Sequence, residues 1–432
     1  MANNSTGKRQ RAWQTQRLAV IAFLGLAGCA VNPVTGEREL SLVSEAQELA
    51  VGRENYADYR QQQGGDYTLE PELTRYVNRI GQALSAHSDR PNLPYEFVVV
   101  NNPTANAWAL PGGKIAINSG LLRHLDDEAQ LAAVIGHEII HAAARHGAAQ
   151  MSRGMLLNVG LAAIAVGSQG SSVEWLGTAS QYGAAAWMAH YGRDDELEAD
   201  YYGMQLMVAA GYDPLAAVEL QQTFVKLSEG RDSDFVSSLF ASHPPSQARV
   251  DANRALVDRL AVSGERYRER YALTTAALRE AQPAYQAAEK ARKLLQQKRF
   301  EEALAESDKA VAVLPQQVQF WLLRSAIWGA LERPDNAEKA LTTAIGKQPD
   351  YFLPHLLRGQ LRWQQYQWSA SAADYRASYQ RLETAQAAYF IAQEALQRSD
   401  TVTADRYFTA AISHGGDYAE RAAAERQKLR QP

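Results

Sequence analysis

The chain has 432 residues, of which 46% are hydrophobic and 21% charged, a composition typical of folded proteins with two or three domains. Its formal net charge is −4, and removing the first 28 residues would bring it to −8, because they carry four positive charges and no negative ones. So acidic a protein is a poor nucleic-acid binder, and a single cysteine excludes disulfides within the chain.

Residues 1–28 have the pattern of an export signal. A positively charged start precedes the apolar run LAVIAFLGLA, which is shorter than the roughly 20 residues that span a bilayer. The run ends in Leu26-Ala27-Gly28-Cys29, which resembles the lipobox of bacterial lipoproteins. The resemblance implies cleavage before Cys29 and lipid attachment to it, and Ala30 favours the outer membrane. The alternative is an exported protein with a free thiol.

Two helices and three strands are predicted before residue 119. The helices are 41–63, entered through Ser41 or Ser44 and ended by Gly64-Gly65, and another that begins at Pro71. The strands are 95–100, 107–110 and 114–118, the last two forming a hairpin over Pro111-Gly112-Gly113. We expect 114–118, KIAIN, to have an unpaired edge, which either binds an extended peptide or binds nothing.

The sequence AAVIGHEIIHAAARHG, residues 132–147, predicts a metal-binding helix. His137 and His141 are one turn apart and can bind one Zn²⁺, while Glu138 can act as general base toward a water on the metal. The alternative is a packed, hydrogen-bonded histidine pair without a metal.

This helix is expected to be capped by Asp126 or Asp127 and to end at Gly147. Residues 155–166, MLLNVGLAAIAV, form a second apolar run, which is too short to span a bilayer. We expect a core helix or a mobile loop there, with a loop that touches the membrane as the alternative.

A third zinc ligand is expected, because catalytic zinc usually has three protein ligands. The best candidate lies in DDELEADY, residues 194–201, at the start of a helix. Glu196 and Asp200 are one turn apart, so Glu196 can bind the metal while Asp200 accepts the free N–H of a zinc-bound histidine. The alternative is an acidic helix start that only complements the helix dipole.

The motif HEIIH followed by ELEAD resembles the signature HExxH and ExxxD of the gluzincin metallopeptidases of the HtpX and CAAX-prenyl-protease family. Ser242-His243-Pro244, followed by Arg249, also fits a family element that lies over the metal, although it could be only a turn before the next helix. The resemblance implies one zinc ion held by His137, His141 and Glu196, with Asp200 behind them and with Glu138, His243 and Arg249 as catalytic residues.

From about residue 284, small residues recur every 34 positions, which resembles the pattern of tetratricopeptide repeats. The repeated positions are Ala291, Ser325 and Gly359; Ala303, Ala337 and Ser371; and Ala310, Ala344 and Ser378. A fourth unit, with Ala392, Ala404 and Ala411, is offset by one residue and is expected to be a degenerate cap. The alternative is an unrelated helical bundle.

The predicted fold is mainly α: a signal peptide (1–28), an α+β gluzincin metalloprotease domain (29–262), a helical linker (263–283) and an α-solenoid of tetratricopeptide repeats (284–432). This combination resembles the BepA-type periplasmic proteases, which act in outer-membrane protein assembly and quality control. The lipobox cysteine is not part of that group's pattern.

The predicted function is therefore a zinc endopeptidase in the periplasm, lipid-anchored to the outer membrane. Its expected substrates are unfolded or misassembled proteins, and its repeats are expected to contact the outer-membrane assembly machinery. The alternative is a periplasmic chaperone or scaffold whose protease is mostly latent. His243 has two possible roles: it stabilises the transition state, or it occupies the fourth zinc position as a latch.

Overall fold

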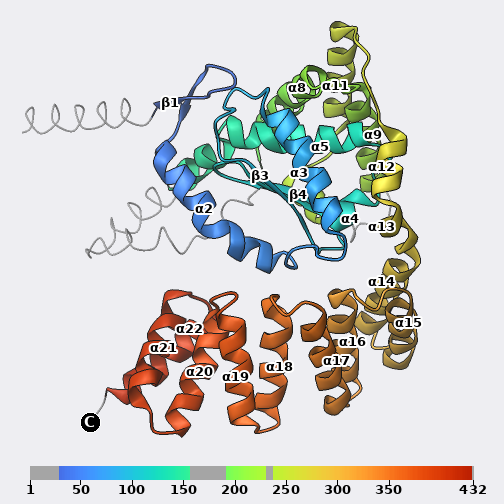
Figure 1. The fold of residues 1–432 in the computed structure, drawn as a ribbon. Coiled ribbons are helices and arrows are strands. Elements are labelled where there is room, and N and C mark those ends of the chain that lie inside the picture. The colour runs from blue at the N-terminus through green and yellow to red at the C-terminus, as the bar shows by residue number, and fades with distance from the viewer. Residues whose placement is uncertain (1–28, 156–190, 230–236, 431–432) are drawn as a thin grey trace, which may run out of the picture.

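The computed structural model describes residues 29–155, 191–229 and 237–430, and Figure 1 shows a mixed amino-terminal domain beside a row of paired helices. The predicted fold class is confirmed. The expected export signal, 1–28, and residues 156–166 of the apolar run lie outside the described residues. Within the described ranges, no helix is both long enough and apolar enough to cross a membrane.

A three-stranded sheet forms the centre of the amino-terminal domain. Its strands are β3 (Glu96–Val100), β4 (Ala107–Leu110) and β5 (Lys114–Asn118), in the order β3-β5-β4. β4 and β5 form the predicted antiparallel hairpin, and β3 pairs with β5 in parallel. Gly112 and Gly113 in the hairpin turn have φ angles of +73° and +78°, a conformation that favours glycine.

The expectation of a free edge along KIAIN is wrong, because β5 is hydrogen-bonded to β3 on one side and to β4 on the other. The hairpin pattern specified one neighbour of β5 but not the second, which is a strand from earlier in the chain. β4 is instead an edge strand of this sheet. A short helix, α4 (Ser119–Leu122), separates β5 from the helix with the histidine motif.

The two faces of the sheet pack against different helices. One face, with Phe97, Val99 and Ile115, contributes to the main core together with α3 (Pro71–Ser85) and α5 (Glu128–Ala143). On the opposite face Trp108 packs against the tyrosines of α2 (Glu45–Gln62), which Ser44 caps as predicted. Because successive side chains of a strand point to opposite faces, one face of the sheet packs directly against α5.

The motif helix α5 begins as predicted but ends earlier. Asp127 caps it by accepting a hydrogen bond from the backbone N–H of Gln130 at 2.9 Å. The helix ends at Ala143 rather than at Gly147, because Arg145 adopts a left-handed conformation with a φ of 64°. Its guanidinium donates to Glu48 and to the carbonyl of Val43, both at 2.7 Å, and residues 146–155 form a new helix.

α8 (Arg193–Ala209) crosses α5 at two glycines. A Cβ atom on Gly136 would lie 2.9 Å from the carbonyl oxygen of Gly203, and one on Gly203 would lie 3.0 Å from the backbone nitrogen of His137. The two backbones therefore touch directly. This contact brings the acidic start of α8 to the histidines of α5.

We expect Gly136→Ala to lower the free energy of unfolding by about 1–2 kcal/mol. Overpacking costs roughly 1–3 kcal/mol, and against a backbone carbonyl that cannot rotate away we take the upper part, about 2–3 kcal/mol, from which helix propensity recovers about 1 kcal/mol. Urea denaturation of the full chain measures the change. Gly346→Ala in α17 (Pro334–Lys347) is the control, since a Cβ there has no neighbour within 4 Å. Equal stability of Gly136→Ala and wild type would contradict a direct backbone contact.

The segment 263–283, predicted as a linker, packs against the amino-terminal domain. It contains α12 (Arg268–Thr274) and α13 (Ala276–Glu280), and Tyr271 and Leu278 are fully buried in the main core. The Tyr271 hydroxyl donates to the carbonyl of Leu122 at 2.6 Å, and Arg270 pairs with Glu128 at the start of α5. The segment thus supports the motif helix, and its assignment as the linker between two domains stays a prediction.

Paired helices form the carboxy-terminal part, as the 34-residue period predicts. All twelve predicted small positions are buried, including those of the fourth unit. That unit is a complete pair, and one further helix follows it. The helices are α14 (Gln282–Gln296), α15 (Phe300–Val313), α16 (Val318–Ala330), α17, α18 (Phe352–Gln364), α19 (Trp368–Tyr379), α20 (Ala385–Gln397), α21 (Thr401–Ser413) and α22 (Asp417–Leu429).

The loops that precede α16 and α18 fasten the repeats to the amino-terminal domain. The amides of Asn101 and Gln317 donate to each other, both at 2.9 Å. Gln348 donates to the carbonyl of Asp66 at 3.1 Å, and Gln61 donates to the carbonyl of Asp350 at 3.0 Å. These polar contacts set the repeats in a defined orientation beside the sheet.

Candidate metal centre

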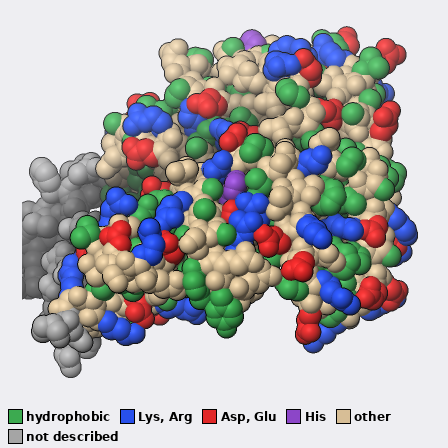
Figure 2. Space-filling model, turned by 60° about the horizontal axis from the view of Figure 1, so that its bottom comes forward, with side chains coloured by type: hydrophobic (Ala, Val, Ile, Leu, Met, Phe, Trp, Pro, Cys, Tyr) green, Lys and Arg blue, Asp and Glu red, His purple; other side chains and the backbone are tan. Residues whose placement is uncertain are grey.

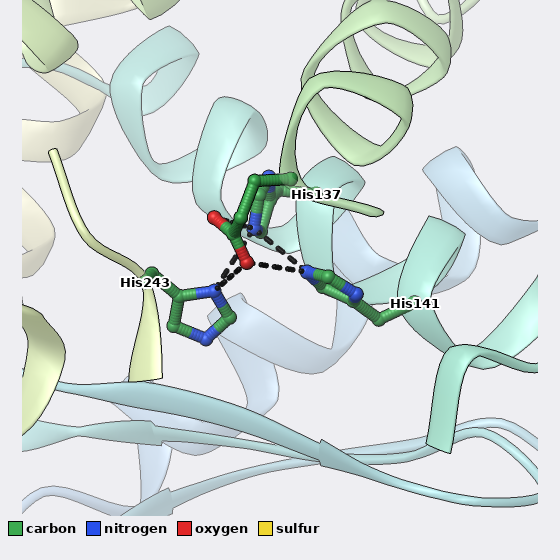
Figure 3. Close-up of side chains that lie close together, drawn as sticks. His137, His141 and His243 are labelled. Atoms are coloured by element: carbon green, nitrogen blue, oxygen red, sulfur yellow. Dashed lines mark hydrogen bonds and ion pairs between the residues drawn. The ribbon is translucent and has the colours of Figure 1, made fainter. Parts of the chain in front are cut away.

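Three distant parts of the chain converge on one buried cluster. His137 and His141 project from α5, Glu196 from the first turn of α8, and His243 from the loop after α10 (Ser237–Ser242), so that the four side chains can offer ligand atoms within 4.8 Å of one another. Figure 3 shows the three histidine rings pointing toward a common centre. The sequence motifs predicted three of these residues as ligands and His243 as a neighbour.

The spacing of the ligand atoms fits a small tetrahedral ion. The Nε2 atoms of His137 and His141 are 3.0 Å apart, and Nδ1 of His243 is 3.2 Å from Nε2 of His137 and 2.9 Å from Oε1 of Glu196. The same carboxylate lies 3.4 and 3.5 Å from the two other rings. Four ligands at about 2.0–2.1 Å from a tetrahedral zinc ion are about 3.3–3.4 Å apart.

Hydrogen bonds turn the ligand nitrogens inward. Asp200 lies 2.9 Å from Nδ1 of His137, so this nitrogen carries the proton and Nε2 presents a lone pair to the cluster. Nδ1 of His141 is similarly 2.8 Å from Nδ1 of His146. The ring of Tyr191 stacks on His141 with centroids 3.8 Å apart, which restrains its plane. Two lone pairs that face each other at 3.0 Å favour a cation between them.

The electrostatics of the cluster leave His141 neutral and the carboxyl groups of Asp200 and Glu196 ionised. Burial holds the pKa of His141 well below its ordinary value, so the ring is neutral. Burial alone would raise the pKa of Asp200, but Arg249 and His137 outweigh it and keep that pKa low. The pKa of Glu196 is also lowered, because His243 and His137 outweigh the effect of burial.

Glu138 lies beside the cluster in a cavity. Its side chain is 2% exposed, Oε1 is 3.5 Å from Nε2 of His243, and Oε2 receives no hydrogen bond from the described part of the chain. Burial raises the pKa of this carboxyl above its ordinary value, and the lowering influence of His243 and His137 does not cancel this effect. The cavity wall is largely apolar and includes Ala107, Leu121, Val134, Met204, Leu220, Phe224 and Leu239.

Arg249 holds the carboxylates in place. It donates to both oxygens of Asp200 at 2.7 Å and lies 2.7 Å from Oε2 of Glu196. Ser246 caps α11 (Gln247–Leu260), so the predicted turn before a helix is present as well as the predicted approach to the metal. With its guanidinium engaged in this way, Arg249 contacts the candidate ligand Glu196 and the supporting carboxylate of Asp200, and its catalytic role stays a prediction.

Some residues near the metal centre were not predicted from the sequence. His146 and Tyr191 contact His141, Glu198 lies 3.3 Å from His146, and Asn253 donates to Asp200 at 3.4 Å. The available signal was the density of histidines, since three of the nine in the chain lie between residues 137 and 146.

Comparison with known proteins gives consistent matches. Residues 71–257 match the profile of peptidase family M48. The chain is 33% identical to the Beta-barrel assembly-enhancing protease of Escherichia coli (strain K12) over 237 residues, which cover 52% of this chain and 47% of that one. It is 36% identical to the Mitochondrial metalloendopeptidase OMA1 of Arabidopsis thaliana over 169 residues, covering 39% and 33%.

A third relative is matched over most of its length. The chain is 30% identical to the Metalloprotease YcaL of Escherichia coli (strain K12) over 189 residues, which cover 44% of this chain and 71% of that protein. By contrast, the chain spans about half the length of the Beta-barrel assembly-enhancing protease.

Proposed function

The chain belongs to peptidase family M48, and from this premise we propose that it is a periplasmic, lipid-anchored zinc endopeptidase that acts on unfolded or misassembled outer-membrane proteins. The predicted metallopeptidase family and zinc cofactor are confirmed, since family M48 is zinc-dependent and the buried cluster suits a metal ion. The proposal rests above all on one observation: Glu138 lies next to four inward-facing ligand atoms at the end of an apolar cavity.

We assign the residues as follows. His137, His141 and Glu196 hold one zinc ion, and Asp200 fixes the ring of His137 with support from Arg249. A bound zinc ion supplies Lewis acidity for attack of water on the scissile carbonyl. Glu138 accepts a proton from the attacking water at its carboxylate and delivers a proton to the leaving amine. The apolar wall excludes bulk water and receives a side chain of the substrate.

The substrate is expected to bind as an extended strand beside β4. This edge strand replaces the β5 edge expected from the sequence, and its first residue, Ala107, lines the same cavity as His137 and Glu138. A peptide that pairs with the outer edge of β4 would carry its carbonyl groups past Glu138. Main-chain pairing of this kind suits unfolded segments of many sequences.

The repeats, which we take to begin near residue 284, are proposed to recruit protein partners. Figure 2, in which the repeat side of the molecule comes forward, shows basic and acidic side chains intermingled with hydrophobic ones on this face. Such a mixed surface suits a protein partner better than a polyanion. The name of the Beta-barrel assembly-enhancing protease supports a machinery for β-barrel assembly as that partner, which we take to be that of the outer membrane.

Metal analysis of the purified protein tests the assignment. We expect about one zinc per chain in the wild type and digestion of casein. In Glu196→Ala we expect zinc affinity, measured by competition with a chelator, to fall at least about tenfold, because the cluster loses its carboxylate ligand and keeps only the three histidines. Glu54→Gln, which alters an exposed carboxylate on α2, is the control. Wild-type zinc affinity in Glu196→Ala would exclude Glu196 as a ligand.

Cell fractionation tests the lipid anchor at Cys29. We expect wild type in the membrane fraction and Cys29→Ala in the soluble periplasmic fraction, since several acyl chains at about 0.8 kcal/mol per CH₂ retain a protein and their loss releases it. Mass spectrometry of the mature amino terminus checks the modification directly. A variant that stays with the membrane would point to another attachment.

One observation favours a second candidate function, a chaperone or scaffold with a mostly latent protease. Nδ1 of His243 lies within the ligand cluster, and four protein ligands would leave no position for water on a tetrahedral ion. In this arrangement binding by the repeats would continue while hydrolysis waits for His243 to move.

A further inference from the structure

A series of polar side chains, buried at His146 and Asn32 and partly buried at Glu198, leads from the metal centre to the amino-terminal hairpin, which consists of β1 (Cys29–Val31) and β2 (Arg38–Leu40). We propose that His146 and Glu198 position His141 for zinc and that Asn32, in the turn of this hairpin, is the last member of the series. This inference rests on the zinc site proposed above. Packing of the hairpin against α8 would then raise the affinity of the metal centre for zinc.

The first link is the pair of imidazoles. His146 is 1% exposed, and its Nδ1 is 2.8 Å from Nδ1 of His141. Because Nε2 of His141 faces the cluster as a ligand, its proton is on Nδ1 and is donated to His146. His146 accepts with Nδ1 and therefore carries its own proton on Nε2, on the side away from the metal.

The second link is a carboxylate of α8. Oε1 of Glu198 is 3.3 Å from Nε2 of His146, on the side where that ring carries its proton; the contact has the distance of an ion pair, and its angle falls outside that of a hydrogen bond. Glu198 lies two residues after Glu196, so α8 supplies both a ligand and the support of another ligand. A metal-bound histidine whose second nitrogen is held in this way has a fixed tautomer and ring orientation.

The third link is Asn32 in the hairpin. Asn32 is 2% exposed, and its amide group donates to Glu198 and to Glu39, both at 2.9 Å. Its carbonyl oxygen accepts from the backbone N–H groups of Val34 and Thr35 at 2.9 and 3.3 Å, which shapes the turn between the strands. Asn32 thus joins the turn of the hairpin to the carboxylate behind the metal site.

The chain segment after the hairpin is fastened to the helix that carries His146. The backbone N–H of Leu42 donates to Oγ of Ser152 at 2.8 Å, and Arg145 donates to the carbonyl of Val43. Hairpin, helix and metal ligand therefore form one packed unit. Because coupling between two binding events is reciprocal, bound zinc should also stabilise the docked hairpin.

The test measures zinc affinity by competition with a chromophoric chelator, independently of proteolysis. We expect His146→Leu to weaken zinc binding about 10–100-fold, and His146→Asn to recover most of the loss because its Oδ1 can accept the proton of His141. We expect a smaller loss, about three- to tenfold, in Asn32→Asp, which keeps the turn but cannot donate to Glu198. His87→Leu alters an exposed histidine and serves as the control.

Several outcomes would overturn the proposal. Wild-type affinity in His146→Leu rejects the role of His146, and equal losses in His146→Leu and His146→Asn indicate packing in place of a hydrogen bond. Wild-type zinc affinity in Asn32→Asp would mean that the hairpin does not contribute to the positioning of His141. Thermal unfolding of the zinc-free proteins shows whether each variant folds. If His146→Leu does not fold, the proposal is tested by the zinc affinity of Asn32→Asp and by the absorption spectrum of its cobalt-substituted form. Failure of the wild type itself to bind zinc would instead reject the proposed function.

Discussion

Glu138→Gln is expected to reduce proteolysis about 10²–10⁴-fold while the protein keeps its zinc. The amide has the shape of the carboxylate but cannot take the proton from the attacking water. Glu138 sits on α5 between the two histidines and is buried, so the substitution leaves the ligand atoms where they are. Removing a buried carboxylate whose ionised form is disfavoured should not destabilise the fold.

The measurement is digestion of unfolded casein, with zinc content and thermal unfolding determined on the same preparations. Glu54→Gln, the exposed variant on α2, should digest casein like the wild type. Activity of Glu138→Gln within about tenfold of the wild type, with zinc retained, would mean that another group accepts the proton.

The local parts of the site were predictable from the sequence. The spacing of His137 and His141 and the cap at Asp127 depend only on helix geometry, and both are present. Glu196 and Asp200 were also found as a pair one turn apart. What periodicity could not provide is the crossing of α5 and α8 at Gly136 and Gly203, on which the meeting of these two motifs depends.

His146 shows why the surroundings of the metal were harder to predict. On a continuous helix a residue five positions after His141 points about 140° away from it. The left-handed backbone at Arg145 breaks the helix and turns His146 back toward His141. That break is stabilised by Glu48 and Val43, which lie about a hundred residues earlier in the chain. A local pattern carries no information on such partners.

The sheet illustrates the same limit. The hairpin of β4 and β5 followed from its turn and its alternation, but the parallel pairing of β3 with β5 joins strands that are not adjacent along the chain. Because the prediction did not include that pairing, it assigned the free edge of the sheet to β5. The corrected edge, β4, borders the cavity that contains Glu138, so the peptide-binding hypothesis is transferred to another strand.

His243→Ala is expected to raise proteolysis of an unfolded substrate by about tenfold to a hundredfold. The ring lies within the ligand cluster, with Nδ1 2.9 Å from Glu196 and 3.2 Å from the ligand nitrogen of His137. A ring in this place occupies the position that water needs, and a latch that shuts about 99% of molecules lowers the rate about a hundredfold.

The competing role predicts the opposite sign. An imidazole that stabilises the oxyanion contributes roughly 2.7–4 kcal/mol, so its loss would lower turnover about 10²–10³-fold. Zinc affinity separates the two roles further, because removing a latch removes a ligand and weakens zinc binding, whereas a group that acts only in the transition state leaves it unchanged. His87→Ala is the control for loss of an exposed histidine. A fall of a hundredfold or more, with zinc retained at wild-type affinity, would reject the latch.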